Sequence, residues 1–310
     1  MTEENLNENA ANENAAVPVR TETFPADGPL QIDVGVTIGK VEIHLTDQPG
    51  EARVELRQDS SEKPPWVDGM ASMLNWVTER FGNQFGTEVD TSSGDAVGEA
   101  RIEKIGNRLV VQASKSLPLR NIPLAVTVHA PAGSHLEVRA GAADVSVSGS
   151  AGRADILTGS GVVALDRADG AVIVRTGSGG VKLGPTLAGL QLRSGSGDVE
   201  ASSLSGSATL ATGTGDIWLG AVSGDVMVRS GSGDLSVADA ASGSLELITG
   251  SGEIRIGIRS GVAAEIDLTS LAGKPSSELE VADSAPEGEV PLKIRARTGS
   301  GNAVVTPAAQ

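Results

Sequence analysis

Apolar and polar residues alternate with a period of two along most of the chain, beginning near Leu30. The first alternating stretches lie at 30–34 and 41–45, and others follow at 101–114 and 124–138. Because successive side chains of a β-strand point to opposite faces, this alternation predicts strands that each have one buried face. We therefore expect a chain that is almost entirely β.

A repeat of 18 residues organises the chain from Gly141 onward. Its first glycine recurs every 18 residues as far as Gly231, then one residue late at Gly250, and a last copy begins at Gly299. Counted from that glycine, positions +4, +6, +13 and +15 are apolar in nearly every copy, and a second turn separates the two pairs. Such a unit cannot bury its own apolar face, so it must stack on copies of itself.

The repeat length suits one coil of a β-solenoid, with neighbouring coils about 4.8 Å apart. The predicted fold class is all-β, a β-solenoid (β-helix) with 18-residue coils and one short amphipathic helix as an insertion. Between the inward pairs we expect outward ladders that face solvent, formed by Ser146, Lys182, Glu200, Trp218, Ser236 and Arg255.

The period breaks in two places, at 64–86 and at 269–297. The first break has apolar residues at helical spacing over 67–82, which predicts an amphipathic helix. This helix either covers an open end or flank of the solenoid or docks a partner, and both readings stay open. The residues of this cap or partner surface are Trp66, Met70, Met73, Trp76 and Phe81. The second break predicts an irregular insertion with its own strand before a final rung.

These patterns predict one structured domain. Residues 1–29 are expected to be a disordered acidic tail and lead-in, because their beginning is rich in Asn, Glu and Ala. A single β-solenoid domain is expected over 30–305, with a helical insertion at 64–86 and an irregular insertion at 269–297. Residues 306–310 form a C-terminal tail.

Composition narrows the picture further. Only 2% of the residues are aromatic and 40 are glycine, so the core must consist of thin layers of small aliphatic side chains. The net charge of −16 argues against nucleic acid as a partner, because the long-range field would repel it. There is no transmembrane segment and no visible secretory signal, so the expected location is cytoplasmic.

The recurring Ser-Gly-Ser-Gly-Asp motif offers three kinds of chemistry. A phosphate cradle needs a helix after the glycines, but here a strand follows each copy. A calcium loop is the alternative metal site, on Asp198, Asp216, Asp234 and Glu253. We favour a tight turn in which the glycines supply positive φ and the carboxylates accept hydrogen bonds from turn amides.

Arginines recur two residues before the first glycine, on the other side of the same turn. We expect them to form a surface lattice of ion pairs with the carboxylates. The members of this series are Arg139, Arg175, Arg193, Arg229 and Arg297.

The sequence gives no sign of catalysis. The three histidines, His44, His129 and His135, lie in unrelated local contexts without triad or ligand spacing. The turns of the repeat are short and leave no cleft, so we expect no enzyme activity and no cofactor.

The stretch PLAVTVHAPAGSHLEVRAGAADVSV at 123–147 leads into the iterated Gly-Ser-Gly-Asp units. Together they resemble the bacterial putative-adhesin family of β-strand repeat proteins, domain of unknown function 4097. The resemblance covers roughly residues 30–305. It implies a β-solenoid, no known catalysis, and an association with the bacterial envelope, adhesion or envelope stress.

The sequence thus predicts a non-enzymatic β-solenoid binding or scaffold module, whose partner is an unidentified protein or envelope component. One alternative is a structural solenoid that self-associates through its ends into filaments. A second is a carbohydrate-active β-helix enzyme. A cell-envelope location is the alternative to a cytoplasmic one.

Overall fold

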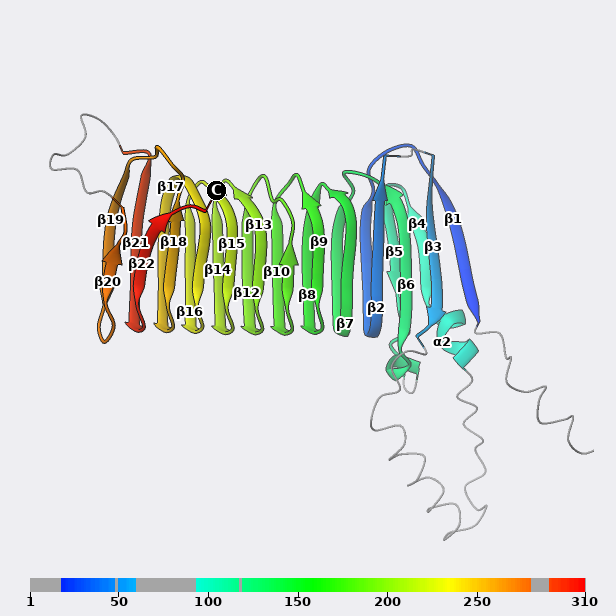
Figure 1. Cartoon of the computed structure of the whole chain (residues 1–310). Helices are drawn as coiled ribbons and strands as arrows, with labels where there is room; N and C mark the ends of the chain where they lie inside the picture. The colour runs from blue at the N-terminus through cyan, green and yellow to red at the C-terminus, as the bar shows by residue number, and fades with distance from the viewer. Residues whose placement is uncertain (1–17, 48–49, 60–92, 117–118, 280–289, 310) are drawn as a thin grey trace, which may run out of the picture.

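The computed structural model describes residues 18–47, 50–59, 93–116, 119–279 and 290–309. These residues form one elongated stack of β-strands (Figure 1). The helix predicted at 67–82, with Trp66, Met70, Met73, Trp76 and Phe81, lies outside the described residues. None of the helices in the described part is long and apolar enough to cross a membrane.

The middle of the stack is made of rungs with one strand on each of two faces. Each strand pairs in parallel with the strand one repeat later, as Leu192 of β12 does with Leu210 of β14. Face A contains β8 (Arg153–Ser160), β10 (Val172–Ser178), β12 (Leu190–Ser196), β14 (Ala208–Thr214) and β16 (Val226–Ser232). Face B contains β9 (Val163–Ala168), β11 (Val181–Leu183), β13 (Val199–Ser205), β15 (Ile217–Ser223) and β18 (Ile254–Ile258). Two longer strands, β7 (His135–Ala151) and β17 (Leu235–Ser251), bend from one face to the other.

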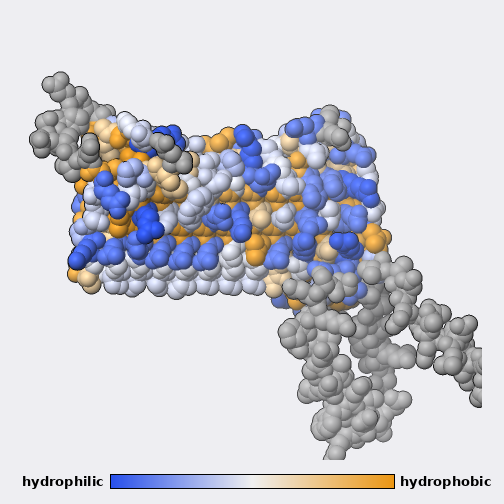
Figure 2. Space-filling view, in the orientation of Figure 1, coloured by the Kyte–Doolittle hydropathy of each residue, from blue (hydrophilic) through white to orange (hydrophobic). Residues whose placement is uncertain are grey.

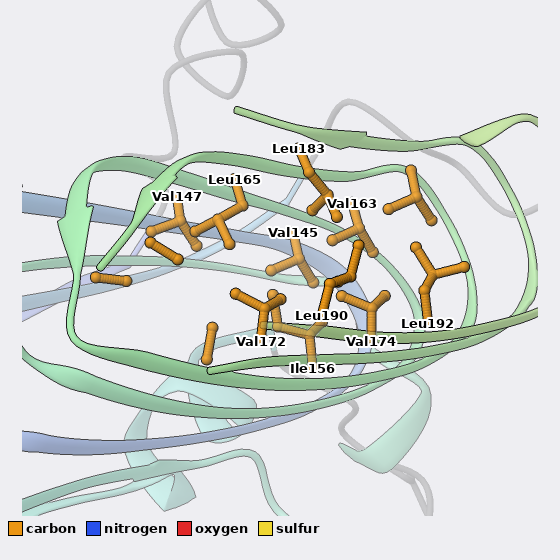
Figure 3. Close-up of a cluster of buried hydrophobic side chains, with 14 of the residues drawn as sticks. Val145, Val147, Ile156, Val163, Leu165, Val172, Val174, Leu183, Leu190 and Leu192 are labelled. Atoms are coloured by element: carbon orange, nitrogen blue, oxygen red, sulfur yellow. The ribbon is translucent and has the colours of Figure 1, made fainter. Parts of the chain in front are cut away.

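The core is the layer of aliphatic side chains between the two faces. Figure 3 shows side chains such as Val145 and Val163 from face B lying against Ile156 and Val174 from face A. All four side chains are fully buried. The apolar positions of the repeat therefore point inward, and the predicted β-solenoid is confirmed.

At the N-terminal end, β2 (Gln31–Thr46) forms a complete rung and pairs in parallel with β7. Its other edge pairs with β5 (Arg108–Gln112) on face A and β6 (Leu124–Pro131) on face B. Antiparallel strands finish this end: β3 (Gly50–Gln58) on β6, β1 (Val19–Ala26) on β3, and β4 (Arg101–Ile105) on β5. Strand β2 passes through Gly39, which turns the chain from face A to face B at φ +127°.

Two elements of this end were not predicted. Strand β1 lies in the segment for which we expected a disordered tail and lead-in, and its burial pattern alternates between exposed and half-buried. The helix α2 (Ser93–Glu99) occupies a Ser/Gly/Asp-rich stretch just before the alternating stretch at 101–114. It buries Ala96 and Val97 against the core, and a 3₁₀ turn, η1 (Leu119–Asn121), lies nearby.

At the C-terminal end, the order of rungs in space differs from their order in the chain. Strands β21 (Leu292–Ser300) and β22 (Ala303–Pro307) pair with β17 and β18 on one edge. Their other edges pair with β19 (Ala264–Ser270) and β20 (Pro275–Ser277), which come earlier in the sequence. Strand β20 and most of β21 lie inside 269–297, so regular pairing extends into the segment that we predicted to be irregular. The division into one domain over 30–305 stays a prediction.

Candidate functional site

Each rung turns from face A to face B at a corner built from the Ser-Gly-Ser-Gly-Asp motif, here called the glycine corner. Figure 1 shows these corners along the lower edge of the stack. The second glycine of each copy has positive φ, for example +112° at Gly197. A Cβ atom on Gly197 would lie 2.3 Å from the carbonyl oxygen of Gly179, and one on Gly195 would lie 2.5 Å from that of Gly177. Both glycines are therefore required, the first by close approach and the second also by its backbone conformation.

A row of buried hydroxyl groups lines the inside of this corner. The hydroxyl of Thr176 donates to the carbonyl oxygen of Ser178 at 2.9 Å, and the same bond recurs in the other rungs. The donors are Thr158, Thr176, Ser194, Thr212, Ser230, Thr249 and Thr298. We did not predict this row, although Ser or Thr directly before each first glycine was its visible signal.

The carboxylates after the second glycine hydrogen-bond to the backbone of the following rung. Asp198 Oδ1 accepts from the amide of Asp216 at 2.9 Å, and Asp216 Oδ1 accepts from that of Asp234 at 2.8 Å. Asp234 Oδ1 accepts in turn from the amide of Glu253 at 2.7 Å. The interpretation of these residues as turn acceptors is confirmed. Figure 2 shows a row of hydrophilic surface beside the pale edge of the stack.

The calcium alternative concerns the same four acidic residues, Asp198, Asp216, Asp234 and Glu253. One oxygen of each aspartate is engaged with a backbone amide. Among the described residues, no three His, Cys, Asp or Glu side chains gather into a group that could hold a metal ion. Calcium binding stays an untested prediction.

The expected lattice of Arg and Asp ion pairs is wrong. Arg175, Arg193, Arg229 and Arg297 form no ion pair with any residue that the structure describes. Arg139 pairs with Glu137 of its own strand rather than with a corner aspartate. The physical reason is that the arginines lie on face A before the corner, whereas the aspartates lie after it, where face B begins.

The outward ladder of face B is present as predicted. All six predicted residues occupy one column, in register from rung to rung: Ser146, then after Ala164 Lys182, Glu200, Trp218, Ser236 and Arg255. Trp218 is 43% exposed, which is unusual for a large aromatic side chain. Chemically different side chains thus share one position on a regular backbone.

Two histidines that we placed in unrelated contexts are neighbours. Strand pairing brings His44 of β2 opposite His129 of β6, and their rings stack with centroids 4.8 Å apart. His44 Nδ1 also hydrogen-bonds Ser148 Oγ at 2.8 Å. Burial, and then the nearby charge of His44, lower the pKa of His129. Only the pairing of β2 with β6 creates this contact, so local sequence held no signal for it.

A hollow of about 400 Å³ lies where β2, β5 and η1 meet beside β7. Its lining includes Lys115, Arg120 and Arg139, together with Thr37 and the buried carboxylate of Asp33. Asp33 accepts a hydrogen bond from Arg108, which raises the pKa of that guanidinium. Lys115 and Arg120 form no ion pair within the described residues, so the hollow carries net positive charge.

Comparison with known proteins gives one family and several solved structures. The family model described as Toastrack DUF4097 matches residues 125–305. No curated protein matches the chain.

The solved structures are bacterial. A putative adhesin from Bacteroides fragilis is 13% identical, with a TM-score of 0.37, and covers 94% of this chain and 97% of its own. One from Parabacteroides distasonis is 11% identical, with a TM-score of 0.31 and coverage of 94% and 98%. A putative cell adhesion protein from Clostridium sporogenes is 8% identical, with a TM-score of 0.20 and coverage of 94% and 99%. These TM-scores are low, so the structures say nothing further about this chain.

Proposed function

Because the chain belongs to the Toastrack DUF4097 family, we propose that it is a non-enzymatic binding or scaffold module of the bacterial cell envelope. The observation that carries this proposal is the set of outward columns on two flat faces. A rung can change its outward residue without changing its inward packing, as Lys182, Glu200 and Trp218 do in one column. The solenoid therefore presents a long surface whose outward side chains can vary while the backbone stays regular.

Binding to envelope material tests this proposal. The purified full chain is sedimented with isolated envelopes of Gram-positive and Gram-negative bacteria, and the bound fraction is measured. We expect saturable retention that falls when outward residues are changed, for example in a Lys182→Glu, Trp218→Ser variant or an Arg193→Glu, Arg229→Glu variant. Ser207→Ala, an exposed change in the turn before β14 and outside both columns, serves as the control. Retention no greater than that of an unrelated acidic protein would overturn the proposal.

The open C-terminal rung favours a second candidate, end-to-end self-association. Among the described strands, β19 pairs with β21 alone, and Ala264, Ile266 and Leu268 are half-buried rather than buried. Leu271, beside them, is 84% exposed. An edge of this kind can pair with a strand of a second copy. Sedimentation velocity over a range of concentrations tests this candidate. A sedimentation coefficient that rises with concentration in the wild type but not in Ile266→Lys supports it, and a monomer at every concentration rejects it.

The proposed partner surface at Trp66, Met70, Met73, Trp76 and Phe81 needs a test of its own. Deletion of residues 64–86 separates its two readings. A soluble, monomeric product that has lost envelope retention would identify an interaction element. An aggregating product would identify a cover for the core.

A further inference from the structure

A column of arginines runs along the outer surface of face A, next to the glycine corner. Strand register places eight residues of successive rungs in this arginine column. In spatial order they are Arg139, Leu157, Arg175, Arg193, Ala211, Arg229, Ile248 and Arg297. Five guanidinium groups thus share one line about 34 Å long, given a rung spacing of about 4.8 Å.

The charges of this column are not neutralised by the protein. Only Arg139 has an ion-pair partner among the described residues, and the other four arginines are exposed to solvent. Like charges one or two rungs apart repel each other, so repulsion between these arginines destabilises the protein when no ligand is bound. The chain has a net charge of −16, so this positively charged line is opposite in sign to the molecule as a whole. A bound anion would reduce the repulsion between the arginines.

The spacing of the column has a regular element. Arg193, Arg229 and Arg297 lie two rungs apart, or about 10 Å, and so do Arg139 and Arg175. Arg175 and Arg193 lie on adjacent rungs, so the alternate spacing changes phase between them. The rungs between these pairs carry Leu157, Ala211 and Ile248, of which Leu157 is 44% exposed. A ligand with an anionic group at every second step therefore matches Arg193, Arg229 and Arg297 and meets Ala211 and Ile248 between them.

The middle of the neighbouring column on face A suits a neutral, hydroxylated surface. Beside the four central rungs it presents Ile173, Gln191, Thr209 and Met227, none of which is charged, whereas its ends carry Glu137, Asp155, Glu246 and Arg295. Gln191 and Thr209 can donate and accept hydrogen bonds, while Ile173 and Met227 offer apolar contact. No aromatic side chain occurs in either column, so there is no stacking platform for nucleobases.

The hollow at β2, β5 and η1 lies at the N-terminal end of the column, since Arg139 belongs to both. Lys115 and Arg120 add two cationic groups there. A linear anionic chain that follows the column would therefore reach a concave, positively charged end point.

We propose that face A binds a linear acidic polysaccharide with a carboxylate on alternate sugars, lying along the stack with about one sugar per rung. An extended β-linked sugar chain advances by about the spacing of one rung, roughly 5 Å, so carboxylates on alternate sugars remain in step with Arg193, Arg229 and Arg297. Guanidinium groups bind carboxylates in bidentate fashion, and the apolar rungs contact the sugar rings. This inference rests on the proposed binding function and names its ligand class.

Calorimetry with defined oligosaccharides tests the proposal. The probes, each about eight sugars long, are hyaluronan, with carboxylates on alternate sugars, polygalacturonate, with one on every sugar, and a neutral chitin oligosaccharide. A single-stranded oligonucleotide of similar charge is the fourth probe. We expect hyaluronan to bind most tightly, with an affinity that falls as salt is raised, and the chitin oligosaccharide not to bind.

Matched variants assign the binding to the column. Arg193→Gln and Arg229→Gln should each weaken hyaluronan binding by about threefold to fivefold, and the double variant by about tenfold or more. Arg193→Lys, which keeps the charge but loses the planar fork, should fall between. Arg167→Gln removes a guanidinium from β9 on face B and should leave affinity unchanged. All these residues are exposed, so the melting temperature of each variant should match that of the wild type.

Three results would overturn the proposal. The first is tighter binding of the oligonucleotide, which would identify a nucleic-acid surface. The second is equal loss in Arg167→Gln, which would indicate a general charge effect. The third is no hyaluronan binding, or tighter binding of polygalacturonate, which would contradict the two-rung spacing. If envelope retention persists while hyaluronan fails to bind, the proposed function stands and only this ligand class is wrong.

Discussion

The glycine corner and the outer surfaces of the two faces differ in how strongly the fold dictates their residues. At the corner, a hydroxyl, two glycines and a carboxylate recur because each has a backbone partner at short range, as in Thr176 to Ser178. On face B, one column changes from Lys182 to Glu200 to Trp218 with no break in register. Corner positions are constrained from both neighbouring rungs, whereas outward positions meet solvent.

This difference teaches that similarity between repeats marks architecture here and that variation marks function. The most conspicuous motif of the chain, Ser-Gly-Ser-Gly-Asp, shapes the turn. The binding chemistry that we propose lies two residues away, in arginines that the corner separates from the aspartates.

The comparison predicts the largest effect at the second glycine. Gly197→Ala should lower the free energy of unfolding by more than about 4 kcal/mol, because it adds backbone strain to a clash with Gly179. Thermal and urea unfolding of the full chain measure this. Gly50→Ala is the matched control, since Gly50 has φ +130° but open space around its Cβ position. Equal losses of unfolding free energy in the two variants would show that the clash with the neighbouring rung adds nothing to the backbone strain.

A smaller effect is expected from the buried hydroxyl row. Thr176→Val keeps the shape but leaves the carbonyl oxygen of Ser178 without its donor, which should cost about 1–2 kcal/mol. The outward Thr209→Val should stay within about 0.5 kcal/mol of wild type. The same unfolding experiments compare the two variants. If Thr176→Val leaves the free energy of unfolding unchanged, the hydroxyl row does not stabilise the corner.

The carboxylate of the corner should contribute less again. Asp216→Ala removes the acceptor for the amide of Asp234 and should cost about 1 kcal/mol. Asp216→Asn keeps an acceptor oxygen and should lose less than half of that. A stabilising Asp216→Ala would instead indicate that repulsion along the acidic column outweighs its hydrogen bonds.

The smallest effect belongs to the outward histidine pair. Because the pKa of His129 is lowered in the fold, the unfolded chain binds more protons between that lowered value and the ordinary value of 6.5. Stability should therefore fall as the pH is lowered through 6.5 toward the folded-state pKa, by no more than about 0.5 kcal/mol at this exposed site. Melting temperatures of wild type and His129→Gln across this range measure it. A stability of the wild type that rises with falling pH would contradict the sign.

The sequence was sufficient for the fold because the period repeats every contact of the core. Once Gly195, Val199 and Leu210 are placed in one rung, the other rungs of the regular repeat between Gly141 and Gly250 follow. The same period misled us about the arginines, since residues five apart in sequence look adjacent until the corner turns them onto different faces. Contacts between residues outside the 18-residue repeat could not be predicted from the sequence. His44 and His129 meet only through the pairing of β2 with β6, and β1 is a polar edge strand with little apolar signal.

The crossed order of strands at the C-terminal end has a mechanical consequence. In a simple solenoid the last strands of the chain have one neighbouring rung, so a pull on the terminus would peel them away bond by bond. Here β21 and β22 are clamped between β17 and β18 on one edge and β19 and β20 on the other. A force applied at the C-terminus must break the hydrogen bonds on both edges of these strands together. The end of the stack therefore resists tension more strongly than a terminal strand with a single neighbour would.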